Sequence, residues 1–420
     1  MTGARAADAA AVVRTVETAF RIESARIIAS VTRIVRDVGL AEEIAQDALV
    51  AALERWPRTG VPDRPGAWLT ATAKHRAIDL VRRKETYARK LAEVGRSLED
   101  MPPPPEPADP DDIDDDLLRL IFTACHPVLS TAARIALTLR LLGGLTTGEI
   151  ARAFLTSEAT VAQRIVRAKR TLASAAVPFE VPYGAEREAR LSSVLEVVYL
   201  IFNEGYAATA GDDLVRPALC EDALRLARVL AGLMPDEPEV HGLAALLELQ
   251  ASRIPARTGP DGEPVLLADQ DRTRWNRMLI LRGMEALRRA GGGPYSLQAA
   301  IAAQHARQVR YADTDWAAIA ALYGRLLELA PSPVVALNRA VAVGMAEGPA
   351  AGLELVDALA GEPALKDYHL LPSVRGDLLE RLGRGPEART EFTRAAALTR
   401  NARERDLLLR RAARADPAGA

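Results

Sequence analysis

The sequence predicts an all-α protein with more than one domain, and three observations support this prediction. Of its 420 residues, 49% are hydrophobic and only 4% are aromatic, a composition typical of helix-rich chains. Apolar residues recur at the three- and four-residue spacing of amphipathic helices along most of the chain. Prolines and glycines stand at the turns between these stretches, as in Leu233–Pro235 and Leu329–Pro331. We expect little β-structure.

Charge divides the chain into four expected domains, although its net charge is only −2. Residues 1–96 carry 17 basic and 12 acidic groups, and residues 97–116 carry nine acidic groups, no basic group and six prolines. Residues 117–180 carry eight basic and three acidic groups, and residues 181–420 carry 29 and 32. Because prolines oppose helix formation and carboxylates repel one another, residues 97–116 are predicted to be an extended linker.

Several classes of protein are excluded at this stage. No apolar run approaches the roughly 20 residues of a membrane helix, and the N-terminus lacks the pattern of a signal peptide. Cys125 and Cys220 are far apart and form no metal-binding or disulfide pattern. We therefore expect a cytoplasmic protein with no membrane contact, no metal and no cofactor.

The first domain is predicted to be a helical bundle. Helical periodicity runs from Val13 to Ile34, from Leu40 to Trp56 and from Ala67 to Lys90. The prolines and glycines between Arg58 and Gly66 predict a loop.

The third domain contains a predicted helix-turn-helix, with helices over Thr147–Phe154 and Ser157–Ala175. Ile150, Val161 and Ile165 can form its core, and Ser157 is placed to cap the second helix. The polar residues left outside this core are Thr160, Gln163, Arg164, Arg167 and Lys169. Such donors suit base edges and phosphates in DNA. The alternative is an ordinary helical hairpin with a solvated basic face.

The last domain alternates helices and short turns. Pro331 and Pro363 are 32 residues apart, and Gly348-Pro349 recurs after 37 residues as Gly385-Pro386. These periods bracket the roughly 34 residues of a tetratricopeptide (TPR) unit, which predicts a TPR-like α-solenoid. A hairpin is expected near Asp261-Gly262.

Together these features resemble the extracytoplasmic-function (ECF) sigma factors, in which a region-2 helical bundle and a region-4 helix-turn-helix are joined by a flexible linker. Residues 40–49 (LAEEIAQDAL) resemble region 2.2, and residues 66–84 resemble regions 2.3 and 2.4. Residues 201–206 (IFNEGY) and 333–342 (PVVALNRAVA) resemble the TPR-like extension of one ECF group. The resemblance implies an alternative sigma factor, not an enzyme, whose partners are core RNA polymerase and promoter DNA.

The resemblance also assigns roles to individual residues. Contact with core polymerase would fall to Glu43, Gln46 and Asp47, whose spacing places them on one helix face. The residues assigned to the opened −10 element are Arg58, Arg64, Trp68, Lys74, His75, Arg76, Arg82, Arg83 and Lys84. Those assigned to the −35 element are Ser157, Thr160, Gln163, Arg164, Arg167 and Lys169. The extension would modulate activity through an intramolecular contact or a protein partner.

Two other functions remain open from the sequence. The first is a one-component regulator, in which the helix-turn-helix binds duplex DNA and the repeats sense a ligand. The second is an enzyme built on polar residues of the extension, namely Asn203, Glu204, Tyr206, His241, Asp269, Asp271, Gln298 and His305. No known catalytic motif accompanies these residues.

Overall fold

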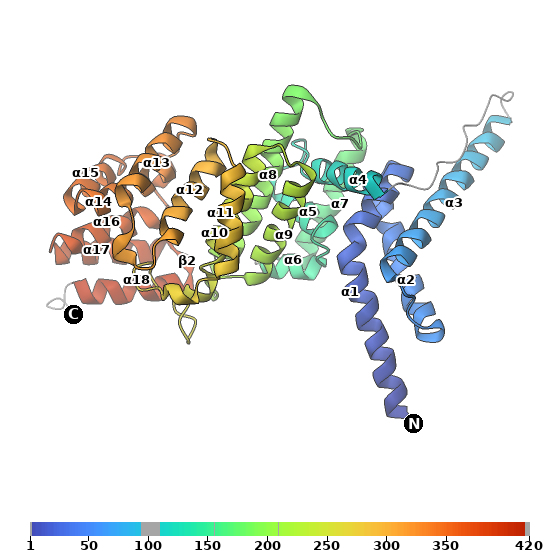
Figure 1. The fold of residues 1–420 in the computed structure, drawn as a ribbon, viewed down its shortest axis with the longest axis horizontal. Coiled ribbons are helices and arrows are strands. Elements are labelled where there is room, and N and C mark those ends of the chain that lie inside the picture. The colour runs from blue at the N-terminus through green and yellow to red at the C-terminus, as the bar shows by residue number, and fades with distance from the viewer. Residues whose placement is uncertain (1, 94–109, 155, 209, 416–420) are drawn as a thin grey trace. The chain divides into compact units, whose positions relative to one another are not determined.

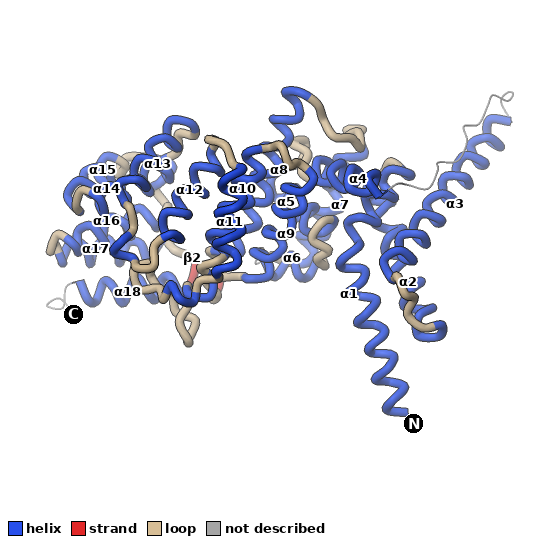
Figure 2. The backbone as a smooth tube through the Cα atoms, viewed as in Figure 1, coloured by secondary structure: helices blue, strands red, loops and turns tan. Residues whose placement is uncertain are grey.

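The computed structural model describes residues 2–93, 110–154, 156–208 and 210–415. Helices form nearly all of the secondary structure in these ranges, as Figure 2 shows, which confirms the all-α prediction. Strands are limited there to a two-residue parallel pair, β1 (Ala210–Gly211) and β2 (Arg400–Asn401). No helix among the described residues is long and apolar enough to cross a membrane. The chain folds as two compact units, residues 1–197 and 198–420.

The first unit opens with a three-helix bundle of α1 (Thr2–Val35), α2 (Val38–Thr59) and α3 (Pro65–Glu93) (Figure 1). The expected loop from Arg58 to Gly66 is shorter than predicted, because α2 continues through Pro57 and only residues 60–64 lie between the helices. Trp56, 2% exposed, anchors this last turn in the bundle core, and tertiary packing here overrides the tendency of proline to end a helix.

The linker prediction also needs correction at its C-terminal end. Helix α4 (Pro110–Ala124) begins at Pro110, so the last seven of the residues assigned to the linker are helical. Proline is tolerated in the first turn because its missing N–H would have no intrahelical partner. Asp116 is fully buried and pairs with Arg119 at 2.8 Å and with Arg33 of α1 at 3.4 Å. The linker residues from 97 to 109 lie outside the described part of the chain.

The helix-turn-helix follows as predicted. Helix α5 (Thr131–Leu141) leads to α6 (Thr147–Ala153) and α7 (Glu158–Ser174), which pack on one another. Thr146 and Glu149 form a reciprocal capping box at the start of α6. The Ser157 hydroxyl accepts from the Thr160 N–H at 3.1 Å, so Ser157 is the N-cap of α7.

Helix α8 (Gly184–Tyr206) begins within the first unit rather than in a separate extension. Ser193 donates to the backbone carbonyl of Cys125 at 2.6 Å, and Glu196 pairs with Arg134 of α5 at 3.1 Å. The domain boundary expected at residue 181 therefore precedes a helical segment that supports the helix-turn-helix, and the compact unit extends to residue 197.

The second unit is a helical array in which each helix packs on its neighbours in sequence or on the next helix but one, as α10 does on α12, an arrangement expected of an α-solenoid. Its helices are α9 (Pro217–Leu233), α10 (Pro238–Ala251), α11 (Arg277–Arg289), α12 (Pro294–Arg307), α13 (Trp316–Leu329), α14 (Pro333–Ala346), α15 (Pro349–Ala358), α16 (Leu370–Arg381), α17 (Gly385–Leu398) and α18 (Ala402–Ala415). Short 3₁₀ helices span Ile254–Ala256, Arg272–Arg274, Tyr311–Asp313 and Pro363–Leu365. The expected hairpin forms one antiparallel bridge, between Thr258 and Pro264.

The two ends of this array are joined, a feature that the solenoid prediction did not include. Strand β1 precedes α9, and its partner β2 precedes α18. The side-chain N–H groups of Asn401, a fully buried residue, donate to the carbonyls of Ala208 at 3.1 Å and Asp213 at 2.9 Å. Its carbonyl oxygen accepts from the N–H groups of Arg403 and Glu404. One side chain thus caps α18 and holds the opposite end of the array.

We expect Asn401→Ala to lower the free energy of unfolding of the second unit by about 2–4 kcal/mol, because it removes a helix cap and leaves two backbone carbonyls without partners. Asn276→Ala is the matched control, since the Asn276 side chain caps α11 by accepting from the N–H groups of Met278 and Leu279; it should cost about 1 kcal/mol. Urea unfolding of the full chain measures both. Equal losses for the two variants would show that the closure adds no stability.

Candidate nucleic-acid and protein interfaces

An acidic and amide face lies on the outer side of α2. Glu43 and Asp47 are exposed and Gln46 is half-buried, as their spacing on one helix face predicts. Asp47 forms a loose ion pair with Arg76 of α3 at 3.6 Å, with side-chain exposures of 68% and 42%. Because an exposed pair of this kind contributes little stability, both groups can exchange partners at low cost.

The basic residues assigned to the −10 element form a stripe along α3 rather than one cluster. Arg64 stands just before the helix and Lys84 lies about two thirds of the way along it, about 30 Å away at the helical rise of roughly 1.5 Å per residue. Arg64 and Arg58, which stands at the end of α2, are exposed, whereas Lys74 is half-buried. The exposed residues of α3 are His75, Arg76, Arg82, Arg83 and Lys84.

Trp68 differs from the basic residues assigned with it. It is half-buried, and its ring meets that of Trp56 edge-on with the centroids 5.4 Å apart. Trp68 therefore belongs partly to the core of the bundle and leaves part of its surface beside the loop of residues 60–64.

The helix-turn-helix brings most of its assigned residues to one groove. Thr160, Gln163, Arg164 and Arg167 line a cavity of about 340 Å³ beside the start of α5. Ser130, which caps α5, lies on the opposite wall. The N-terminus of a helix favours anions, so this groove combines two guanidinium groups with a second source of positive potential.

Lys169 lies apart from this groove. Its ammonium group contacts the carboxylate of Glu42 on α2, and the same carboxylate accepts from the Arg140 guanidinium at 2.6 Å. Arg140 also donates to the carbonyl of Leu145, in the turn before α6. Glu42 is 5% exposed. A single buried carboxylate thus connects the three-helix bundle to both α5 and α7.

Sequence reasoning missed Glu42. The one available signal is that Glu42 borders the buried stripe of Ala41, Ala45 and Ala48, whereas Glu43 points away from it. Its partners are separated from it by 98 and 127 positions along the chain, and no local pattern connects residues so distant.

The polar residues of the extension serve several separate roles. Glu204 pairs with Arg216, His241 contacts the carbonyl of Pro235 at 2.8 Å, and Asp271 caps a 3₁₀ turn. Asp269 is exposed. Three others, Asn203, Tyr206 and Gln298, line one cavity in the second unit.

His305 is held in its neutral form. Burial, together with the nearby positive charges of Arg253 and Arg272, lowers its pKa to about 4. Its ring packs edge-on against Trp316 at 5.2 Å. In the described ranges no three His, Cys, Asp or Glu residues are grouped so as to hold a metal ion.

The three-helix bundle and the helix-turn-helix both match known protein families. Sigma-70 region 2 matches residues 20–86, and sigma-70 region 4 matches residues 119–172. A family of unknown function (DUF6596) matches residues 190–291. The first match lies within the bundle of α1–α3 and the second runs from α4 to α7, so the fold places each region in its own set of helices.

Individual proteins are also similar to this chain in sequence. An uncharacterized protein of Rhizobium meliloti (strain 1021) is 48% identical over 383 residues, which cover 89% of each chain. The ECF RNA polymerase sigma factor SigK of Mycobacterium sp. (strain KMS) is 32% identical over 144 residues, 33% of this chain and 72% of its own. SigK of Mycolicibacterium vanbaalenii is 30% identical over 145 residues, 34% of this chain and 71% of its own. No solved structure matches the chain. The chain belongs to the ECF RNA polymerase sigma factors, and it carries an additional helical extension.

The Glu42 contact generates a prediction about local stability. Glu42→Gln should raise amide hydrogen exchange of α7 and of the start of α2 by about 5- to 150-fold, because it leaves two half-buried cations without their carboxylate, a loss of about 1–3 kcal/mol. Hydrogen-exchange mass spectrometry of the full chain measures this by segment. Glu43→Gln makes the same chemical change at the exposed neighbouring position. Identical exchange in the two variants would mean that the ion pairs do not hold the modules together.

Proposed function

We propose that region 2 of this sigma factor binds core polymerase and the opened −10 strand, and that region 4 reads the −35 element. As an ECF sigma factor, the chain directs core RNA polymerase to promoters; nucleotidyl transfer belongs to the polymerase, and the chain is not an enzyme. The observation that carries this conclusion is the presence of both sigma regions in one chain, each in its own set of helices. A one-component regulator requires no region 2 and is not favoured.

Core polymerase would dock on the outer face of α2. Glu43, Gln46 and Asp47 offer two carboxylates and an amide on one exposed surface, suited to a basic partner face. Because Asp47 also touches Arg76, docking there would release Arg76 for a nucleic-acid phosphate.

The stripe along α3 supports a role in holding the opened −10 strand. Exposed cations spread over several helical turns can follow the backbone of a single strand, with contacts to successive phosphates. The half-buried Trp68 and the loop of residues 60–64 lie at the start of this stripe. An unstacked base would bind there.

The groove beside α7 supports reading of the −35 element. Gln163, Arg164 and Arg167 can reach base edges and phosphates, and the N-terminus of α5 can hold a phosphate on the other wall. Lys169 can join them only after its ion pair with Glu42 breaks. We therefore propose that engagement of promoter DNA loosens the contact between regions 2 and 4.

The extension would modulate this activity, through a contact within the chain or with a protein partner. Its near-neutral charge, 29 basic and 32 acidic groups over residues 181–420, distinguishes it from the DNA-binding modules. We place the protein in the cytoplasm, where a factor that works with polymerase on chromosomal DNA must act.

The docking face leads to a prediction of polymerase affinity. The double charge reversal Glu43→Lys, Asp47→Arg should weaken binding to core polymerase at least tenfold, because attraction at the rim of the interface becomes repulsion. Glu188→Lys, an equivalent reversal at an exposed position on α8, is the control. Surface plasmon resonance with purified core polymerase provides the measurement. Unchanged affinity of the double variant would reject this docking face.

The recognition groove leads to a prediction of sequence preference. Arg164→Ala or Arg167→Ala should cost about 1–3 kcal/mol on the cognate −35 duplex and reduce discrimination against a scrambled duplex, if the residue reads a base. The control is Arg→Lys at the same position, which keeps the charge but loses the bidentate fork, so it should restore binding to the scrambled duplex only. Fluorescence anisotropy compares the variants. Full discrimination by the double alanine variant would eliminate the recognition role.

A further inference from the structure

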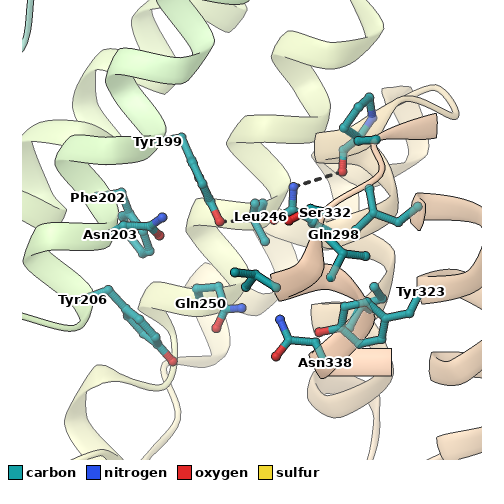
Figure 3. Close-up of a pocket in the computed structure, with 16 residues that line it drawn as sticks. Tyr199, Phe202, Asn203, Tyr206, Leu246, Gln250, Gln298, Tyr323, Ser332 and Asn338 are labelled. Atoms are coloured by element: carbon teal, nitrogen blue, oxygen red, sulfur yellow. Dashed lines mark hydrogen bonds between the residues drawn. The ribbon is translucent and has the colours of Figure 1, made fainter. Parts of the chain in front are cut away.

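A cavity of about 400 Å³ lies inside the second unit, in the region shown in Figure 3. Its walls come from α8, α10, α12, α13 and α14, and all of its lining residues lie within the second unit. None of the lining residues is Asp, Glu, Lys, Arg or His. Tyrosines and side-chain amides supply its polar groups: Tyr199, Tyr206, Tyr323, Asn203, Gln250 and Asn338. The site is uncharged but rich in hydrogen-bonding groups.

One polar atom in this cavity lacks a partner. The hydroxyl of Tyr206 is buried and makes no hydrogen bond within the described residues. In Figure 3 the phenol groups of Tyr206 and Tyr323 extend from opposite sides toward the same space, with the amide of Asn338 between them. Because a buried hydroxyl without a partner is costly, the arrangement calls for a bound group that completes it.

The ring of Tyr206 is fixed in position. It stacks on Phe202 with the centroids 5.6 Å apart, and the guanidinium carbon of Arg257 lies 3.6 Å from the ring centroid. Arg257 is not among the residues that line the cavity, so it acts by holding the ring. These contacts therefore hold the unpartnered hydroxyl in its buried position, away from solvent.

Hydrogen bonds and burial also fix the state of other polar groups in the cavity. The Tyr199 hydroxyl donates to the Gln298 side-chain carbonyl at 3.2 Å, and the Gln298 amide nitrogen donates to the carbonyl of Pro294 at 3.2 Å. Burial raises the pKa of Tyr323 to about 12, so its phenol stays protonated and can donate at neutral pH. An amide side chain offers both a donor and an acceptor.

We propose that this cavity binds one small, uncharged organic molecule that has an apolar body and an amide, lactam or hydroxyl group. The volume is that of a site for a single compact ligand. The lining favours an uncharged ligand, because it contains no charged side chain that could replace the hydration of an ion by direct contact. The apolar body would lie against Leu246, Ile301 and Leu326, and its polar group would reach Tyr206 and Asn338. Binding here does not depend on the promoter activity proposed above.

The test uses isosteric probes that differ in charge. Benzamide, nicotinamide and 4-hydroxybenzamide are compared with benzoate, nicotinate and 4-hydroxybenzoate by ligand-observed NMR titration of the full chain. We expect the amides to bind with millimolar Kd, as fragments of this size do, and the carboxylates to bind at least tenfold more weakly. Tyr206→Phe should weaken the amides about fivefold or more.

Two further measurements separate this role from a structural one. Tyr206→Phe should leave the Tm of the free protein unchanged or raised, because it removes a hydroxyl that has no protein partner. Tyr368→Phe, at a tyrosine outside the cavity, should leave amide binding unchanged. The proposal is overturned if no amide binds, if the carboxylates bind equally well, or if Tyr206→Phe changes nothing. Binding by a blocked tetra-alanine peptide alone would overturn it in favour of a peptide groove.

Discussion

The buried carboxylate of Glu42 is the interaction on which the first unit depends. It lies 5% exposed between Arg140 and Lys169, and it joins the region 2 bundle to two helices of region 4. Asp116 makes a second such junction, with Arg33 and Arg119. A buried ion pair is costly to break on one side, yet it contributes little more than apolar residues would. We propose that this contact holds the two modules in one arrangement until they engage DNA, and that DNA and Glu42 would then compete for Lys169.

Much of this architecture was predictable because it is encoded locally. Helical periodicity gave the bundle, and Ser157 together with the Thr146–Glu149 box marked the helices of region 4 in the sequence itself. The face of Glu43 and Asp47 followed from spacing alone. The local rules failed where tertiary packing prevailed, as at Pro57, which stays helical because Trp56 is buried.

The remaining features depend on residues far apart in the sequence. Nothing near Glu42 indicates Arg140 or Lys169, and nothing near Asn401 indicates the carbonyls of Ala208 and Asp213. The closed array and its uncharged cavity both arise from such distant contacts. Local sequence patterns identify Asn203, Tyr206 and Gln298 as polar residues in apolar helices, but only the fold brings them to one cavity. The other polar residues of the extension have separate structural roles.

We propose that regions 2 and 4 separate when the factor engages polymerase and promoter. Cysteines introduced at Val50 on α2 and Val166 on α7, both about half exposed, can carry a donor and an acceptor dye, since Cys125 and Cys220 are buried and react poorly. Single-molecule energy transfer then compares the free protein with its complex with core polymerase and promoter DNA. Separation of the two regions predicts one high-transfer population in the free protein and a low-transfer population in the complex. Equal transfer in both states would contradict it.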